Sequence, residues 1–285
     1  MTWIRLMTED PSELKSASEV LHHAGQYITM AANHFIPKKE DDSHTNADWY
    51  HKKNWLIGNA IESPYGKIHV ALDYPLLMLI VCDDNFKPIA EIELSGKTKL
   101  EGFNWLNNQL WKHGLEVGHF ESDLHYSIPD HPVFHGAKFE MSIPKHFFEL
   151  ANYRSNGHAL LRKVSERFVD KSDLKIWPHH FDEGILITLK KEGEESIAMI
   201  SMGLSIADQY YPCPYFYVNP WKKDGIEYSD YPKLPSGGKW HTSEWTGQVL
   251  SADHFAGILH HDHQELACQR FLEEALINAE RILLS

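Results

Sequence analysis

The hydrophobic and polar positions of this chain change their spacing several times, and each change predicts a new element. From Leu14 to Phe35 apolar residues recur every three or four positions, which places them on one face of an α-helix. Asp10, Pro11 and Glu13 come just before this stripe, as at a capped helix N-terminus. Between residues 56 and 94 the apolar residues instead alternate in short runs separated by turn residues, which predicts an antiparallel meander.

A similar order of elements follows in the rest of the chain. Thr98 and Glu101 form a capping box, which predicts the start of a second helix. A third helix is expected from Pro144 with an interruption at Asn156–Gly157, and a last helix is expected with Asp262 as its cap. Apolar runs between these two helices predict strands at 175–181, 185–189, 196–204, 215–218 and 239–249.

Helix, meander and helix therefore occur twice, which predicts an α+β protein with two similar lobes and points to an internal duplication. The expected N-terminal lobe covers residues 1–114, the C-terminal lobe covers 144–285, and a histidine-rich connection of 115–143 joins them. Four ionisable residues of the connection fall at every second position: His119, Glu121, Asp123 and His125. In an extended segment they share one face, which suits either a divalent metal ion or an ordinary solvated strand.

The composition is that of a globular protein, and its charge narrows the range of partners. Of 285 residues, 42% are hydrophobic and 24% are charged, and the net charge is −13 with neutral histidines. A chain this acidic is poorly suited to nucleic acid or to an anionic membrane surface. The longest apolar run, 74–82, is too short to cross a bilayer, the first residues lack a signal-peptide core, and the three scattered cysteines indicate reduced thiols. We therefore expect a soluble, cytoplasmic protein.

The segment Ile176–Asp182 combines aromatic residues with two histidines and a carboxylate. If the segment is extended, His180 and Asp182 share one face, and His179 lies on the other face between two aromatic rings. A carboxylate two residues from an imidazole can orient it, or both can approach one ion. The alternative is a core in which both histidines only satisfy backbone carbonyls.

Two further stretches combine aromatic and polar residues. The twelve residues from 210 to 221 contain six aromatics, and Tyr211, Tyr215 and Tyr217 share a face if this stretch is extended. In a strand over 239–249, His241 and Trp245 also share a face. Tyrosine hydroxyls and aromatic rings on one face predict a pocket for a flat or polar ligand, and ordinary core packing is the alternative.

Three histidines, His260, His261 and His263, surround Asp262 at the expected start of the last helix. The positive end of a helix favours neutral imidazole, which is the form that binds metal. A polar helix entrance explains the same residues without any ion. No zinc signature, nucleophile elbow, phosphate-binding loop or dinucleotide fingerprint occurs in the chain.

Several segments resemble a bacterial family known as a domain of unknown function. They are Leu21–Gln26, Glu91–Leu94, Trp177–Asp182 and Pro214–Tyr217. The resemblance runs loosely over most of the chain and implies a full-length bacterial domain of that type. Tryptophan and glycine stand near the positions of His179 and His180 in that family, so the resemblance assigns these histidines no role, and it implies no activity or cofactor.

Three functional hypotheses follow, and the sequence leaves open whether the protein is an enzyme. The first is a pocket in the C-terminal lobe that binds a small polar or aromatic ligand. Its expected lining residues are His179, His180, Asp182, Tyr215, Tyr217, His241 and Trp245. The second is a hydrolase whose divalent metal is held by His180 and Asp182 together with His260, His261 or His263. The third is a structural or interaction protein without such a site.

Overall fold

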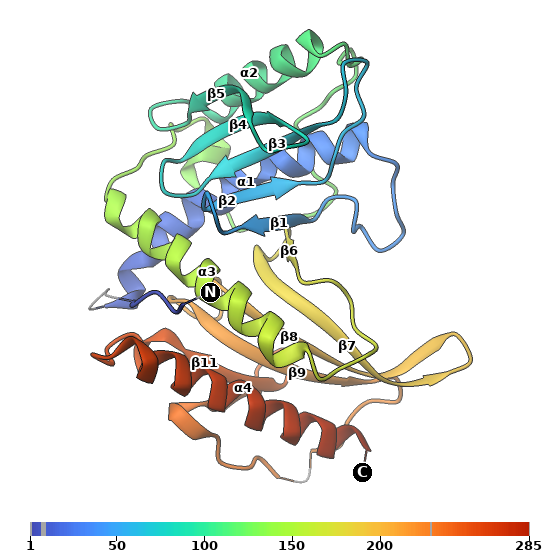
Figure 1. The fold of residues 1–285 in the computed structure, drawn as a ribbon, viewed down its shortest axis with the longest axis vertical. Helices are drawn as coiled ribbons and strands as arrows, with labels where there is room; N and C mark the ends of the chain where they lie inside the picture. The colour runs from blue at the N-terminus through green and yellow to red at the C-terminus, as the bar shows by residue number, and fades with distance from the viewer. Residues whose placement is uncertain (1, 7–9, 229, 285) are drawn as a thin grey trace. The chain divides into compact units, whose positions relative to one another are not determined.

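The computed structural model describes residues 2–6, 10–228 and 230–284, and the chain forms two compact units that are described separately below (Figure 1). Unit 2 contains 16–151 and 176–181, and therefore includes the histidine-rich connection. Unit 1 contains the described residues up to Lys15, those from Asn152 to Lys175, and those from Asp182 onward. Both units combine helices with an antiparallel sheet, so the expected α+β class is confirmed.

Unit 2 begins with a long helix and an antiparallel meander. Its elements are α1 (Lys15–Phe35), β1 (Ala47–Tyr50), β2 (Trp55–Gly58), β3 (Ile68–Asp73), β4 (Met78–Asp83), β5 (Pro88–Glu93), α2 (Lys99–Lys112) and the short 3₁₀ helix η2 (Pro132–His135). The strands β1 to β5 lie side by side in sequence order. Helix α1 packs directly on this sheet, because a Cβ atom on Gly58 would lie only 2.5 Å from Ile28. The capping box predicted for α2 is present, since Thr98 and Glu101 each accept a backbone N–H of the other.

The connection after α2 is not a strand in the region where the sequence places alternating ionisable residues. His119, Glu121, Asp123 and His125 are exposed and lie in irregular backbone, so the shared face expected for them is not formed. Phe120 is buried instead, with its ring packed near those of Phe35 and Phe103. Burial of Phe120 and side-chain contacts such as the hydrogen bond from the Tyr126 hydroxyl to Gln26 therefore hold this segment, and strand pairing does not.

Unit 2 also includes a turn that contradicts the expected strand over 175–181. Strand β6 (Lys175–Trp177) is short, and the chain then turns through 178–181 before β7 (Asp182–Glu192) begins. Phe181 closes the turn, with φ of 56° and its N–H bonded to the carbonyl oxygen of Trp177 at 2.7 Å. A left-handed phenylalanine is unfavourable by itself, but its ring is buried and stacks on His22 at 4.9 Å.

Unit 1 carries a further run of antiparallel strands with two helices on one face (Figure 1). Its elements are α3 (Pro144–Ser165, shared with unit 2), β7, β8 (Glu195–Ser205), β9 (Tyr215–Lys222), β10 (Lys239–His241), β11 (Gly247–Ser251) and α4 (His261–Leu284), with the short 3₁₀ helices η1 (Pro11–Leu14), η3 (Pro235–Gly237) and η4 (Ala252–His254). The strand order is β7-β8-β9-β11-β10. The single strand expected over 239–249 is therefore wrong, because the chain turns between β10 and β11 to form a hairpin.

Helix α3 is continuous through Asn156–Gly157, where the sequence predicts an interruption. A Cβ atom on Gly157 would lie 2.4 Å from the Leu204 side chain, so glycine lets α3 approach β8 closely. Helix α4 begins at His261, and Asp262 lies within its first turn rather than at the cap. No helix in the described ranges is long and apolar enough to span a bilayer.

Candidate functional site

Five of the seven predicted ligand-binding residues gather on the helix-free face of the sheet in unit 1. We call this the tyrosine face, and define it by Asp182, Asp208, Tyr211, Tyr215, Tyr217, His241 and Trp245. They come from β7, β9, β10 and the loops beside them. Strand pairing places Glu183, Leu204 and Phe216 together on the opposite face, where α3 and α4 pack. Alternation along each strand then leaves the tyrosines on the face without helices.

Tyr217 reaches across two neighbouring strands to a carboxylate. Its register partner on β8 is Gly203, whose own partner on β7 is Gly184. A Cβ atom would lie 2.5 Å from the Tyr217 hydroxyl oxygen if added to Gly203, and 2.8 Å if added to Gly184. The two glycines therefore leave room for the phenol to cross the sheet, and its hydroxyl donates a hydrogen bond to Oδ2 of Asp182.

Asp208 and Tyr215 form the second pair of a carboxylate and a tyrosine hydroxyl. Its Oδ2 atom accepts a hydrogen bond from the Tyr215 hydroxyl at 2.5 Å, and its Oδ1 atom accepts the backbone N–H groups of Tyr210 and Tyr211 at 2.8 and 3.1 Å. Burial is the main cause that raises the pKa values of Tyr215 and Tyr217 far above the ordinary range, and the adjacent carboxylates add to it. Both tyrosines are therefore hydrogen-bond donors and cannot act as bases near neutral pH.

The third part of the tyrosine face is aromatic. The rings of His241 and Trp245 stack with centroids 4.2 Å apart, although they belong to β10 and the hairpin loop and not to one strand as the sequence predicts. The Tyr211 hydroxyl lies 3.0 Å from Nδ1 of His241, and the Tyr211 ring packs 4.6 Å from that of Tyr215. The Lys239 ammonium lies 4.8 Å from the Tyr211 ring centroid, so a cation is already held against this surface.

The remaining two predicted ligand-binding residues, His179 and His180, lie in the turn of unit 2. His180 is exposed, and His179 is half-buried with its ring 5.9 Å from that of Tyr126. Because the chain turns before Asp182, His180 and Asp182 do not alternate along one strand, and the expected shared face is wrong. The turn is fixed by α1, since the Pro178 carbonyl oxygen lies 2.9 Å from Nε2 of His22 and 3.0 Å from Nε2 of Gln26.

The residues of the metal hypothesis are not brought together. His260, His261 and His263 are exposed at the start of α4, and Nε2 of His261 lies 3.0 Å from the Asp262 carboxylate. Among the residues that the structure describes, no three histidine, cysteine, aspartate or glutamate side chains are placed to share an ion. The strand geometry that would have aimed His180 and Asp182 at one ion is also absent.

Two polar pairs of unit 1 have no clear signal in the sequence. Asp208 precedes the aromatic run, and only its position two residues before Tyr210 indicates an Asp-initiated turn. Glu183 is buried on the helix-covered face, with Oε1 2.6 Å from Nδ1 of His158 on α3. The two residues are 25 positions apart, so no spacing rule connects them. This pair lies on the other side of the sheet from the tyrosine face.

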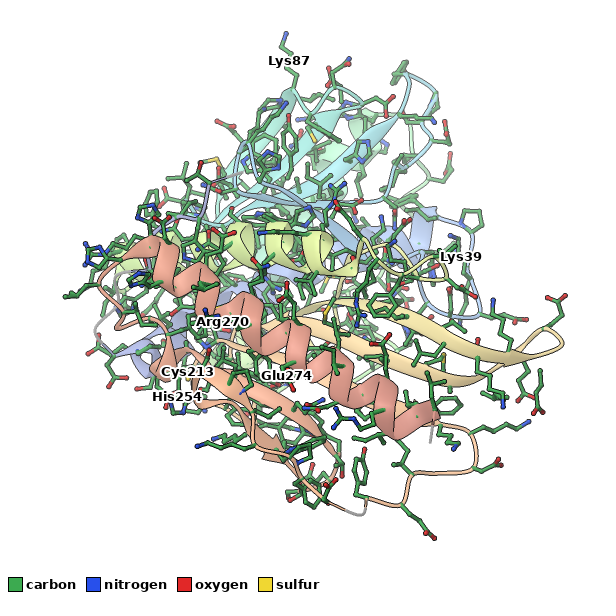
Figure 2. All side chains as sticks on the ribbon, turned by 60° about the horizontal axis from the view of Figure 1, so that its bottom comes forward. Lys39, Lys87, Cys213, His254, Arg270 and Glu274 are labelled. Carbon is green, nitrogen blue, oxygen red and sulfur yellow. The ribbon has the colours of Figure 1, made fainter. Side chains whose placement is uncertain are left out.

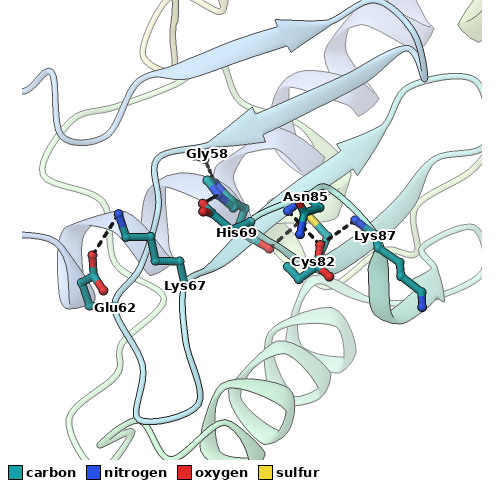
Figure 3. A network of polar contacts seen from close by, with 9 residues as sticks. Gly58, Glu62, Lys67, His69, Cys82, Asn85 and Lys87 are labelled. Carbon is teal, nitrogen blue, oxygen red and sulfur yellow. Dashed lines mark hydrogen bonds and ion pairs between the residues drawn. The ribbon is translucent and has the colours of Figure 1, made fainter.

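A histidine and a cysteine also meet in unit 2, but their contacts are structural (Figure 3). Nδ1 of His69 lies 2.9 Å from the Gly58 carbonyl oxygen, and Nε2 lies 3.4 Å from Oδ1 of Asp84. The Cys82 thiol faces the His69 carbonyl oxygen at 3.8 Å and not its ring. Burial raises the pKa of Cys82 to about 12, so this thiol is not a reactive nucleophile.

A cavity of about 530 Å³ on unit 1 lies away from the tyrosine face. It is bounded by Lys233–Pro235 and by α4, with Arg270 and Glu274 one helical turn apart on its wall (Figure 2). None of the predicted site residues lines it. Comparison with known proteins adds no assignment to these features, because no protein-family model, no curated protein and no solved structure matches this chain.

Proposed function

We propose that the protein binds a small organic ligand on the tyrosine face of unit 1. The observation that carries this proposal is the pairing of two carboxylates with two tyrosine hydroxyls beside a stacked histidine and tryptophan. Asp182 and Asp208 supply hydrogen-bond acceptors, and the rings of His241 and Trp245 supply flat surface. Pockets for small molecules combine a few fixed polar groups with aromatic surface in this way.

The charges of the tyrosine face favour a ligand rich in hydrogen-bond donors. Among the described residues, neither Asp182 nor Asp208 forms an ion pair with lysine, arginine or histidine. Asp208 already accepts four hydrogen bonds, from the Tyr215 and Ser205 hydroxyls and from the backbone N–H groups of Tyr210 and Tyr211. The Tyr217 hydroxyl occupies only part of the roughly four acceptor positions of an ionised Asp182. Hydroxyl or ammonium groups of a ligand would fill the remaining positions of Asp182, and the neighbouring rings would cover the ligand's less polar side.

The chemistry of these side chains favours ligand binding over catalysis as the function of the tyrosine face. Tyr215 and Tyr217 are held as protonated donors by burial, and the residues that define the tyrosine face include no serine, threonine or cysteine that could serve as a nucleophile. A divalent-metal hydrolase has no specific observation in its favour.

The repeated order of helix, antiparallel sheet and helix supports internal duplication as a separate hypothesis, although β10 and β11 are exchanged in the sheet order of unit 1.

A ligand screen with a matched pair of tryptophan variants tests the proposal. Unfolding temperature and amide NMR shifts are measured with a panel of monosaccharides, nucleosides and aromatic amines. Trp245→Ala removes the stacking surface of the tyrosine face, whereas Trp111→Ala removes a 63% exposed tryptophan from α2 in unit 2. We expect at least one compound to shift the amide signals of the unit 1 strands. Trp245→Ala should weaken the binding of that compound, and Trp111→Ala should not. A panel without any hit, or a hit that both variants bind equally, would reject the tyrosine face as the site.

A further inference from the structure

The segment Thr2–Leu6 of unit 1 is held through its main chain by two side-chain amides. Asn156 of α3 accepts the N–H of Ile4 at 2.8 Å and donates to the Ile4 carbonyl oxygen at 2.7 Å. Gln264 of α4 accepts the N–H of Leu6 and donates to its carbonyl oxygen, both at 3.0 Å. Each amide thus imitates the two hydrogen bonds that a neighbouring β-strand would make. We call Asn156 and Gln264 the amide clamp.

Both amides of the clamp are buried, and the Gln264 amide is also held by hydrogen bonds outside the segment. Asn156 and Gln264 are 3% and 0% exposed, and Gln264 Nε2 also donates to the carbonyl oxygens of Ala256 and Ile258 at 2.9 Å. These extra bonds fix the orientation of the Gln264 amide. A buried amide with its orientation fixed is a preorganised recognition group, because little side-chain entropy is lost when it binds.

Side chains of the segment divide into buried anchors and exposed positions. Trp3 and Leu6 are 7% and 1% exposed, and Nε1 of Trp3 donates to Oε1 of Gln264 at 3.2 Å. Ile4 and Arg5 are exposed. The amide clamp therefore binds the main chain at Ile4 and Leu6, and the side chains of Trp3 and Leu6 are buried beside it. Recognition of this kind resembles strand addition, in which main-chain bonds give affinity and side-chain pockets give specificity.

Space for additional chain remains beside the bound segment. A cavity of about 320 Å³ is lined by Thr2 and Trp3, by one face of α3 and by Glu265 of α4. Asn156 and Lys163 are among its α3 residues, so the cavity begins at the amide clamp. The site is thus larger than the five residues that occupy it.

We propose that the amide clamp is a recognition site for extended polypeptide, and that it accepts residues 2–6 of a second copy of this chain in exchange for its own. The contacts of Ile4 and Leu6 are the same whether the segment belongs to the same copy or to another. Exchange therefore loses no hydrogen bond, and protein concentration decides which segment is bound. A second copy is the occupant that the site already fits in sequence and geometry.

Binding of a synthetic peptide to the full chain tests this proposal. Trp3→Ala with Leu6→Ala weakens the internal segment, and a fluorescent peptide with the sequence of residues 2–6 is then titrated by anisotropy. We expect saturable binding, and a loss of at least about tenfold when Asn156→Ala or Gln264→Ala removes two main-chain bonds. A peptide with proline in place of Ile4 lacks the N–H that Asn156 accepts and should bind as weakly. Replacing the exposed Arg5 of the peptide by alanine should change affinity less than twofold.

A second measurement keeps the test decisive if the double variant does not fold. Wild-type protein is mixed with excess spin-labelled peptide, and line broadening of α3 and α4 amide signals is recorded by NMR. Broadening around Asn156 and Gln264 that unlabelled peptide reverses would support exchange. Absence of broadening at saturating peptide, or peptide binding that Asn156→Ala leaves unchanged, would overturn the proposal.

Discussion

Lowering the pH from 7 to 5 is expected to destabilise unit 2 through one buried histidine of α1, His23. The residue is 2% exposed, and its Nε2 atom lies 3.0 Å from the carbonyl oxygen of Pro129. Its Nδ1 atom is buried and has no hydrogen-bond partner among the described residues. A neutral ring that donates from Nε2 fits this site, whereas a proton on Nδ1 would be buried without an acceptor. Burial is the main cause that lowers the pKa of His23 to about 4.

The size of the effect follows from the difference between the folded and unfolded pKa values. An unfolded histidine has a pKa of about 6.5, so between that value and the folded one the unfolded chain binds a proton that the folded chain does not. The free energy of unfolding therefore decreases as the pH falls through this window. The contribution of His23 is close to zero at pH 7 and amounts to a loss of roughly 2 kcal/mol at pH 5.

Urea unfolding of wild type and His23→Gln at pH 7, 6 and 5 measures this contribution. Glutamine keeps an N–H that can reach the Pro129 carbonyl oxygen but does not titrate, so the variant should lose roughly 2 kcal/mol less than wild type between pH 7 and 5. His260→Gln, which removes an exposed imidazole, is the matched control and should follow the wild-type pH dependence. Parallel pH dependences for wild type and His23→Gln would refute the reasoning, whatever their difference at pH 7.

Three other outcomes follow from close contacts and burial. Gly203→Ala should destabilise unit 1 by about 1–3 kcal/mol in chemical unfolding, because the new Cβ would meet the Tyr217 hydroxyl, whereas Gly118→Ala enters open space and should be nearly neutral. Thr98→Ala should cost about 1 kcal/mol by removing the acceptor for the Glu101 N–H, and Thr98→Ser should restore most of it; equal stabilities of the two variants would contradict the capping role. All three cysteines are buried, so Ellman's reagent should label none of them in the native protein within minutes and all three in denaturant; rapid native labelling would contradict their burial.

The helices were the most predictable part of the fold because their signals are local. The stripe that begins at Leu14 predicts α1, although the structure buries this helix on all sides between Val20 and Ala32, and the capping box at Thr98 starts α2 where the sequence places it. Both features depend only on residues within a few positions of one another. Helix α3 shows the limit of such signals. Asn156 and Gly157 have low helix propensity, but the helix continues through them because Asn156 bonds to Ile4 and Gly157 leaves room for Leu204.

The strand expected over 175–181 failed because a long-range contact decides the conformation. Alternation of aromatic and polar residues suits a strand, and nothing local in Trp177–Asp182 marks Phe181 for a left-handed backbone. His22 and Gln26, more than 150 positions earlier, hold the Pro178 carbonyl oxygen and make the turn the better solution. A sequence pattern cannot contain that information, because either conformation satisfies the local preferences of these residues.

The tyrosine face could be predicted from the sequence only in part, less well than the helices and better than the turn at 178–181. The alternation of Tyr215 and Tyr217 along β9 was visible in the sequence and places both rings on one side of the sheet. Their carboxylate partners were not visible as partners, since Asp182 is reached across two glycines and Asp208 comes from a loop. Pleating thus determines which side chains are available on a face, and strand register determines which of them meet. For a binding site made by several strands, register is the decisive information, and in this chain the paired glycines Gly184 and Gly203 are the feature that makes the Tyr217 contact possible.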